Sequence, residues 1–305
     1  MTASLAGAQA WLQREYPQVA AGFLPAAEGV EPPLLVLGER VYASLVRKCD
    51  ASGRPLTEAL EALVHMSVDF MRLQPRFMKT GRYASAGEDG LFERFYGRAE
   101  VMEGYYLDGL LLTYAFWRNH ARLLRFFEDE FLASLPPDAR LGEIGVGHGL
   151  MALSALTRLT EARYDGLDLS PFALTYAEAL LSANGVGPGR ARLRCEDALS
   201  GLPPGSDLDG AWCCEVIEHV TDPLPLLRGL AAALAPSGRA FVTTVANVEA
   251  EDHVYLFDDA AHVRRVLGEA GLAVEKEMAL TLRGFETARP LPLNYAAIVR
   301  RAETA

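Results

Sequence analysis

Short apolar runs alternate with helical patterns from residue 138 to residue 300, and this alternation constrains the fold more than any other feature. The apolar runs predict strands at residues 141–145, 164–169, 191–195, 208–214, 239–245, 272–280 and 293–299. Helical spacing of apolar residues predicts helices at 150–158, 171–183, 224–234 and 259–270. Such alternation through short turns is typical of a doubly wound, mostly parallel sheet, here an α/β sheet of seven strands. No helix separates the last two strands, so we expect the final strand to insert antiparallel.

The first 135 residues have a different pattern. Apolar residues recur at helical spacing between residues 58 and 72, and a long apolar stretch runs from 102 to 117. No run shows the period of two that a half-buried strand would have. Pro75 indicates an interruption of the helices, and Pro136-Pro137 marks the change of pattern. We therefore predict a helical domain at 1–135, placed as a lid, and an α/β domain at 136–305.

The charge balance disfavours several kinds of partner. Among 305 residues, 40 Asp and Glu oppose 29 Lys and Arg, which gives a net charge of −11. A surface that follows nucleic-acid phosphates or anionic lipid needs clustered cations, and the sequence contains no such cluster. We therefore expect a small-molecule substrate, no nucleic acid and no membrane. The sequence does not indicate an oligomeric state.

No segment of the sequence predicts a membrane span or a secretory signal. The longest useful apolar run, residues 110–117, is interrupted by Thr113 and is far shorter than the roughly 20 residues that a spanning helix needs. The cysteines have neither redox nor metal-binding spacing; they are Cys49, Cys195, Cys213 and Cys214. We expect reduced thiols and a cytoplasmic location.

The segment Glu143-Ile144-Gly145-Val146-Gly147-His148-Gly149 stands between a predicted strand and a predicted helix. Glycines permit a tight turn and a close approach of the backbone to a ligand, and the start of the following helix offers unpaired N–H groups. A dinucleotide fingerprint would require glycine or alanine at position 150, which is Leu150. The spacing E-x-G-x-G-x-G is therefore of another kind. Taken alone, it also fits a purely structural turn.

Acidic residues follow three further predicted strands. They stand in the pairs Asp168-Leu169, Asp197-Ala198 and Glu215-Val216. The carboxyl ends of parallel strands meet at one edge of a sheet, so we expect these pairs to gather beside the glycine-rich turn. Asp168 has an alternative interpretation as a helix cap, although Ser170 before Pro171 is better suited to capping. Asp197 has an alternative interpretation as part of an ordinary acidic loop.

Together, these four motifs resemble those of class I S-adenosylmethionine (SAM) dependent methyltransferases of the small-molecule type. The resemblance covers roughly residues 138–300 and implies a Rossmann-like fold with SAM as cofactor. It implies that the glycine-rich turn binds the cofactor, with Glu143, Gly145, Gly147 and Gly149 as candidate residues. It further implies that Asp168 and Leu169 bind the ribose and that Asp197 and Ala198 bind the adenine. The backbone of Glu215 and Val216 would line the methionine end and the adenine face.

Aromatic residues in the helical half are candidates for contact with the reactive sulfonium of SAM. Tyr105, Tyr106 and Tyr114 lie in two aromatic-rich segments. Aromatic faces attract a sulfonium by cation–π forces of about 0.5–2 kcal/mol. The alternative interpretation is that each ring is core between helices.

His219 and His253 are candidates for a general base, because imidazole titrates near neutral pH. His253 follows the fifth predicted strand, in a stretch that often faces the acceptor in small-molecule methyltransferases. Each histidine could instead bond only to backbone or water. No group of His, Asp and Glu has metal-ligand spacing, so the sequence predicts no metal site.

Three functions fit these motifs. The first is methyl transfer from SAM to a small acceptor of natural-product metabolism. The second is cyclisation of SAM itself, which releases methylthioadenosine, because the helical front and its tyrosines also resemble azetidine-2-carboxylate synthases. The third is a non-catalytic SAM-binding module, which the intact motifs disfavour.

Overall fold

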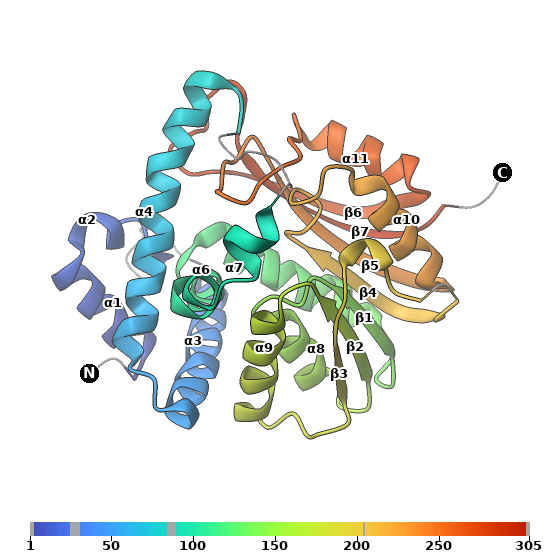
Figure 1. Cartoon of the computed structure of the whole chain (residues 1–305), viewed down its shortest axis with the longest axis horizontal. Coiled ribbons are helices and arrows are strands. Elements are labelled where there is room, and N and C mark those ends of the chain that lie inside the picture. Colours follow the sequence, from blue (N-terminus) through green and yellow to red (C-terminus); the bar gives the residue numbers. More distant parts are fainter. Residues whose placement is uncertain (1–2, 25–30, 84–89, 204, 303–305) are drawn as a thin grey trace.

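The computed structural model describes residues 3–24, 31–83, 90–203 and 205–302. Seven strands in these ranges form one sheet in the order β3-β2-β1-β4-β5-β7-β6 (Figure 1). Their bounds are β1 Arg140–Ile144, β2 Arg163–Asp168, β3 Ala191–Cys195, β4 Leu208–Cys214, β5 Leu234–Ala246, β6 Leu272–Thr281 and β7 Leu293–Arg301. The strands β1 to β5 pair in parallel, whereas β7 runs antiparallel to both β5 and β6. The predicted Rossmann-like sheet and its antiparallel last strand are confirmed.

Two pairs of helices cover opposite faces of the sheet. α8 (Leu150–Arg158) and α9 (Pro171–Ala183) pack on one face, and α10 (Pro223–Ala233) and α11 (Ala260–Glu269) pack on the other. Successive residues of β4 show this division, because neighbouring strand residues point to opposite faces. Trp212 lies in the core with α8 and α9, and Cys213 lies in the core with α10 and α11.

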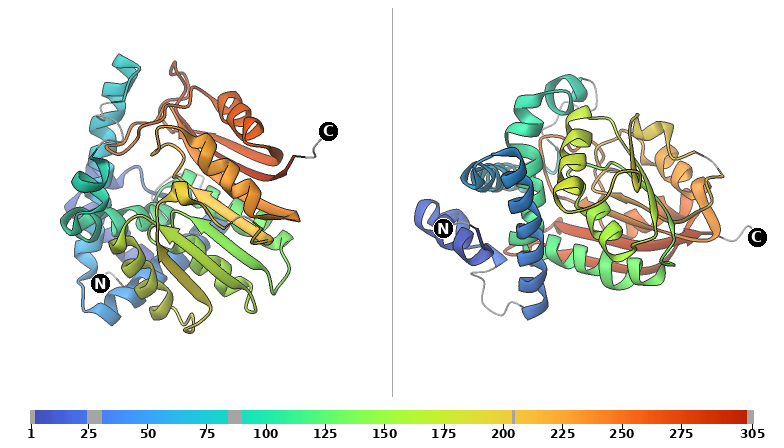
Figure 2. Two further views of the ribbon diagram at one scale, coloured as in Figure 1. Left: turned by 45° about the vertical axis from the view of Figure 1, so that its right-hand side comes forward. Right: turned by 90° about the horizontal axis from the view of Figure 1, so that it is seen from below.

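The N-terminal half is helical, as predicted, and lies at one side of the sheet in both further views (Figure 2). Its α-helices are α1 Leu5–Glu15, α2 Pro17–Ala20, α3 Pro32–Ser52, α4 Leu56–Thr80, α5 Ala99–Val101, α6 Leu107–Phe116 and α7 Arg118–Phe126. Among the residues that the structure describes in this half, three five-residue segments are π-helical instead, namely Phe92–Tyr96, Met102–Tyr106 and Phe127–Phe131.

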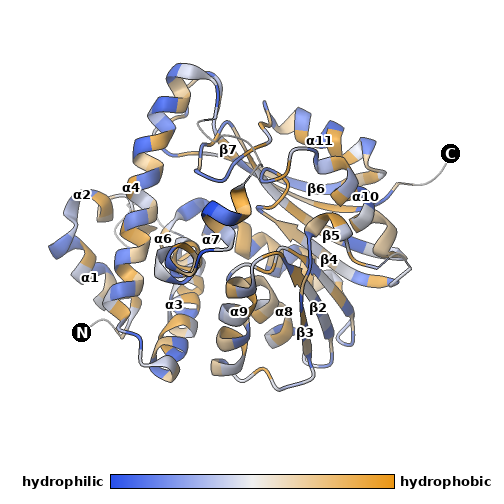
Figure 3. Ribbon diagram, viewed as in Figure 1, coloured by the Kyte–Doolittle hydropathy of each residue, from blue (hydrophilic) through white to orange (hydrophobic). Residues whose placement is uncertain are grey.

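α6 is the central helix of this half. It is apolar around almost its whole circumference (Figure 3), and it packs between α3 and α4. A helix of this composition is stable when it is enclosed by protein. None of the helices in the described ranges is both long and apolar enough to cross a membrane.

The helix α4 differs from the sequence prediction, because it continues through Pro75. Proline lacks an N–H, so the carbonyl of Met71 loses its helical donor. Met71 itself is 49% exposed. Buried Leu73 and Phe77 flank the proline and hold the helix in place by packing.

The helical half and the sheet share one apolar core across the boundary that the sequence suggests at Pro136. Phe127 lies 5.3 Å from the ring of Trp212 and 5.2 Å from the ring of Phe241. Phe131 lies 5.8 Å from Phe241. These aromatic contacts fix the position of the helices against the sheet face that carries α8.

Candidate active site

A cavity of about 960 Å³ lies between the carboxyl ends of the strands and the N-terminal helices. It is where ligands bind in open α/β sheets. Of the ten residues predicted to bind the cofactor, the fold brings nine to the cavity wall. These are Glu143, Gly145, Gly147, Asp168, Leu169, Asp197, Ala198, Glu215 and Val216.

The turn after β1 requires glycine at its first two glycine positions. Gly145 has a φ of +80° and Gly147 a φ of +50°, a region that residues with a Cβ rarely adopt. A Cβ on Gly145 would also overlap the Cγ2 of Val216. The amide of Gly145 donates to the carbonyl of Leu167 at 2.8 Å, which joins the turn to β2.

Gly149, the last glycine of the turn, is not among the residues that line the cavity. Its φ is +73°, and a Cβ there would lie 2.8 Å from the Cβ of Ala177. Gly149 therefore allows the start of α8 to approach α9 closely.

Asp168, at the end of β2, is held by two backbone amides. Its Oδ2 accepts from the Gly147 amide and its Oδ1 from the Ser170 amide, both at 2.8 Å. Burial raises the pKa of Asp168, and the two amide hydrogen bonds oppose that rise. The hydroxyl of Ser170 caps α9, as expected, so Asp168 is not the cap. Its carboxylate is fixed at the cavity wall, directly beside the glycine-rich turn.

Asp197 follows β3 and also lines the cavity. One of its carboxylate oxygens, Oδ1, accepts from the amide of Leu199 at 2.8 Å. The side chain thus caps the short 3₁₀ turn Ala198–Ser200. Asp197 therefore stabilises its own loop and also lines the cavity, so the two interpretations from the sequence do not exclude each other.

Glu143 is 2% exposed, and its Oε2 accepts a hydrogen bond from the hydroxyl of Tyr164. Burial raises the pKa of Glu143 to about 8, although the bond from Tyr164 opposes the rise. At neutral pH the side chain is therefore largely protonated, and it supports the turn from within the core.

A Glu143→Gln variant should change the pH dependence of stability. A carboxyl group whose pKa rises from 4.5 to about 8 on folding stabilises the fold at low pH, and this contribution is lost as the pH rises through 8. The wild type should therefore lose stability relative to the variant between about pH 5 and pH 9, by on the order of a few kcal/mol. Denaturant unfolding at both pH values measures the difference. A constant difference between the two proteins would contradict the assignment.

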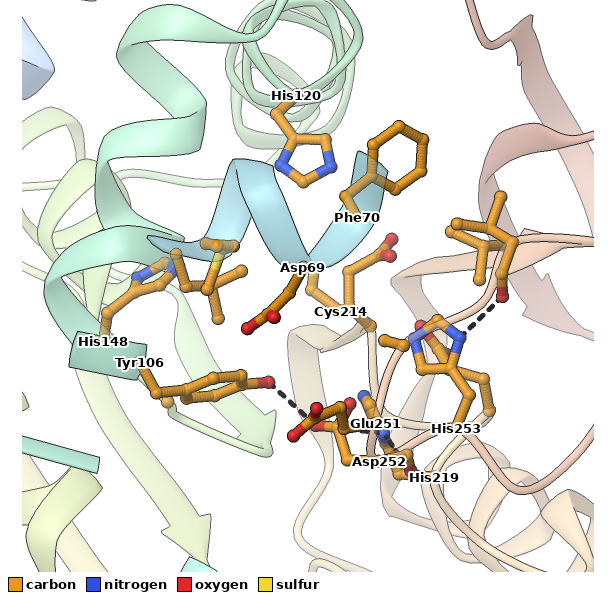
Figure 4. Close-up of a pocket in the computed structure, with 18 of the residues that line it drawn as sticks. Asp69, Phe70, Tyr106, His120, His148, Cys214, His219, Glu251, Asp252 and His253 are labelled. Carbon is orange, nitrogen blue, oxygen red and sulfur yellow. Dashed lines mark hydrogen bonds and ion pairs between the residues drawn. The ribbon is translucent and has the colours of Figure 1, made fainter. Parts of the chain in front are cut away.

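Two tyrosines from the helical half meet one carboxylate on the loop after β5. The hydroxyls of Tyr96 and Tyr106 donate to the Oδ2 of Asp252 at 2.9 and 3.0 Å. Figure 4 shows Tyr106 bonded to Asp252, with His219 and His253 beside them. Burial would raise the pKa of Asp252, but the two histidines and the two tyrosine bonds outweigh it and hold that pKa below its usual value.

The three predicted tyrosines all reach the cavity, in different positions. Tyr106 bonds to Asp252, whereas Tyr114 lies deeper, with its ring 5.4 Å from His148. Tyr105 stacks on His65 at 4.2 Å, next to a small second pocket. The ring of Tyr114 therefore packs in the core between helices and also lines the cavity. The core interpretation and the cofactor-contact interpretation of this residue do not exclude each other.

His219 and His253 come from the loops after β4 and β5, and both line the cavity. The Nδ1 of His219 bonds to the carbonyl of Asp252 at 2.9 Å, and the Nδ1 of His253 bonds to the carbonyl of Val248 at 2.8 Å. Burial lowers the pKa of His253 to about 4, so this ring is neutral at pH 7. Each histidine therefore bonds to the backbone and also lines the cavity.

Sequence reasoning missed Tyr96, His120 and Asp252, which line the cavity, and Gln74, which ties α4 to the loop after β5. Gln74 of α4 is fully buried; it donates to the carbonyl of Asn247 at 2.9 Å and accepts from the amide of Glu249 at 3.0 Å. Each contact joins segments far apart in the chain. The only local signal was the acidic loop around His253, which points to Asp252.

A family model described as a methyltransferase domain matches residues 143–240. Ubiquinone biosynthesis O-methyltransferase from Xanthomonas campestris is 35% identical over 109 residues, which cover 36% of this chain and 44% of that protein. The protein of the same name from Cupriavidus pinatubonensis is 36% identical over 103 residues, or 34% of this chain and 40% of that protein. The chain thus spans less than half the length of these curated relatives.

Two solved structures have the same fold. A phosphoethanolamine N-methyltransferase from Haemonchus contortus aligns with a TM-score of 0.51 and 14% identity, covering 65% of this chain and 58% of that one. The [4+2]-cyclase SpnF aligns with a TM-score of 0.50 and 18% identity, covering 62% of this chain and 84% of that one. At these identities the likeness establishes the fold alone.

Proposed function

We propose that this chain, a member of the class I SAM-dependent methyltransferase superfamily, is an enzyme that transfers a methyl group from SAM to a small molecule. One observation carries the proposal: the glycine-rich turn and Asp168 open into the same cavity as the aromatic wall of the helical half. Pockets for drug-sized ligands have volumes of about 300–1,000 Å³. The cavity of about 960 Å³ is at the upper end of that range, which suits a cofactor together with an acceptor.

We place SAM along the carboxyl ends of β1 to β4. Asp168 would accept the ribose hydroxyls, because its two amide bonds orient the carboxylate at the cavity wall. The adenine would lie near Asp197 and Ala198, and the methionine part would follow the glycine-rich turn toward Glu215. This placement directs the sulfonium toward Tyr106 and the loop after β5.

Catalysis would rest mainly on holding the acceptor in line with the methyl carbon and the sulfur. Fixed alignment of two reactants can lower a barrier by about 7–11 kcal/mol. The clasp of Tyr96 and Tyr106 on Asp252 joins the helical half to the loop after β5, so it closes the reacting end of the cavity. Closure also excludes water from the sulfonium.

The histidine pair is our candidate for handling the proton of the acceptor. His253 is neutral at pH 7 and lines the cavity with His219. A His253→Gln variant should lower turnover by about 100-fold or more while SAM affinity changes little. Unchanged turnover would remove His253 from the reaction.

A second candidate keeps SAM and changes the reaction. The neutral amine of SAM would attack its own γ-carbon, the bond from that carbon to sulfur would break, and methylthioadenosine and azetidine-2-carboxylate would leave with loss of a proton. The observation that favours it is the pair of tyrosines bonded to Asp252, which brings aromatic faces and a carboxylate to the reacting end of the cavity.

Incubation of the purified protein with SAM alone separates these functions. Methyl transfer predicts that SAM stays intact until an acceptor is added and that S-adenosylhomocysteine then accumulates. Methylthioadenosine with an equal amount of the cyclic amino acid, measured by mass spectrometry, would establish cyclisation instead. Binding of SAM without either product under any condition would favour a non-catalytic module.

A further inference from the structure

The loops after β4 and β5 bring together three side chains that bind metal ions in many proteins. One potential ligand atom from each of Glu218, His219 and His253 lies within 4.8 Å of the other two. All three residues line the cavity. The sequence predicts no metal site, because His253 is remote from the other two in the chain; the fold removes that separation.

Backbone carbonyls fix the tautomers of both imidazoles. A carbonyl oxygen can only accept a hydrogen bond, so the Nδ1 of His219 must donate to Asp252 and the Nδ1 of His253 must donate to Val248. In a neutral ring the lone pair then lies on Nε2. Metal-binding histidines characteristically donate their other N–H to a carbonyl or a carboxylate in this way.

The carboxyl groups of Glu218 and its neighbour Glu215 add a second observation at this site. Its side chain is fully buried, and its Oε2 accepts from the hydroxyl of Thr244 at 2.7 Å. Within the described part of the chain, neither its Oε1 nor the Oε1 of Glu215 receives a hydrogen bond. A buried carboxylate oxygen without a donor needs either a proton shared with the neighbouring carboxyl or a cation as its partner, and the two adjacent imidazoles favour a cation.

We propose that Glu218, His219 and His253 form a binding site for a divalent first-row transition metal ion. The ligands would be the Oε1 of Glu218 and the Nε2 of each histidine. One carboxylate and two imidazoles suit ions such as Mn²⁺, Fe²⁺, Co²⁺ and Zn²⁺, and three protein ligands leave coordination positions open. Because the three residues line the cavity, the open positions face the space for the acceptor.

The role of the ion, unlike its binding, rests on the proposed methyl transfer. A bound ion lowers the pKa of a hydroxyl group that it contacts. With Nδ1 bonded to a carbonyl and Nε2 on the ion, neither histidine could take the proton itself, so the ion would replace the direct role proposed above for the histidine pair. The acceptor O–H would lose its proton to solvent, its oxygen would bond to the methyl carbon, and the carbon–sulfur bond would break to release S-adenosylhomocysteine. The site therefore points to an acceptor with a hydroxyl group.

The binding test uses the full chain, stripped with a chelator and dialysed, in the absence of SAM. Titration with Mn²⁺, followed by the EPR signal of the free ion, should reveal one site per chain; calorimetry with Zn²⁺ is run in parallel. Glu218→Gln and His253→Gln should each weaken binding by at least about 10-fold, the lower limit seen even for residues that only support ligands.

Glu251→Gln is the matched control, because it removes a carboxylate from the same cavity and keeps all three ligands. It should change affinity by less than about threefold if coordination rather than general charge attraction holds the ion. Stoichiometric binding that is lost in the ligand variants and kept in the control supports the site. Absence of binding to the wild type, or equal binding by the His253→Gln variant, overturns it.

Two further measurements separate this proposal from the proposed function and from misfolding. Circular dichroism and thermal unfolding of the metal-free variants show whether they fold, and His219→Gln serves as a replacement for any that does not. SAM affinity, measured in EDTA, tests the cofactor site alone. Metal binding without SAM binding would refute the proposed function and support the metal site. SAM binding without metal binding would refute the metal site and leave the proposed function standing.

Discussion

A Gly145→Ala variant should lose SAM binding by at least about 100-fold, which corresponds to about 3 kcal/mol. Two effects combine at this position. The φ of +80° disfavours a residue with a Cβ, and the new methyl group would overlap the Cγ2 of Val216. Either the turn or the side chain of Val216 must move to relieve the overlap. Both segments line the cavity, so the cofactor loses its fit on two sides.

Calorimetric titration with SAM and with S-adenosylhomocysteine measures this loss. Gly268→Ala is the control, because Gly268 lies within α11, and a Cβ there meets nothing within 4 Å. Alanine favours a helix over glycine by about 1 kcal/mol, so this variant should keep its SAM affinity and be at least as stable as the wild type. An affinity of the Gly145→Ala variant within threefold of the wild type would show that the turn does not hold the cofactor.

An Asp168→Ala variant should have an effect of similar size, for a different reason. It removes the carboxylate proposed to accept the ribose hydroxyls and leaves the amides of Gly147 and Ser170 without their acceptor. Hydrogen bonds to a charged group contribute about 1.5–3 kcal/mol each, so we expect SAM affinity to fall by about 100-fold. Asp168→Asn keeps the shape of the side chain but replaces one acceptor oxygen with a donor NH₂ group. Its SAM affinity should therefore lie between that of the wild type and that of Asp168→Ala.

Asp165→Ala provides the matched control on the same strand. Asp165 accepts from the Nε of Arg194 at 2.7 Å and is not among the residues that line the cavity. Loss of this carboxylate should leave SAM affinity unchanged, with a small change in stability. If Asp168→Ala binds SAM as tightly as Asp165→Ala does, Asp168 has only a structural role.

The sheet could be predicted from the sequence because its signals are local. Short apolar runs placed all seven strands, and β5 alone begins several residues earlier than expected, at Leu234. The glycine-rich turn and Asp168 were also predictable, since each lies at a strand end whose position the pattern fixes. Ser170 was correctly predicted to cap α9.

The remaining features depend on contacts between distant segments. α4 continues through Pro75 because buried neighbours stabilise it, which local propensity does not reveal. The clasp on Asp252 joins residues that are 146 and 156 positions away in the chain. The π-helical segment Met102–Tyr106 shifts the side chains out of the 3.6-residue period, so a pattern built on that period cannot place Tyr106.

The aromatic contacts of Phe127 and Phe131 have a consequence for building hybrid enzymes. Both residues precede Pro136 in the chain, yet their rings pack on Trp212 and Phe241 of the sheet. A chimera joined at Pro136 would bring foreign side chains against this surface and leave it poorly filled. Phe126, the last residue of α7, also packs on Phe241, with 5.8 Å between the ring centroids. A junction before Phe126 keeps the aromatic cluster with its own sheet, so the exchangeable part of the helical half ends within α7, before the change in sequence pattern.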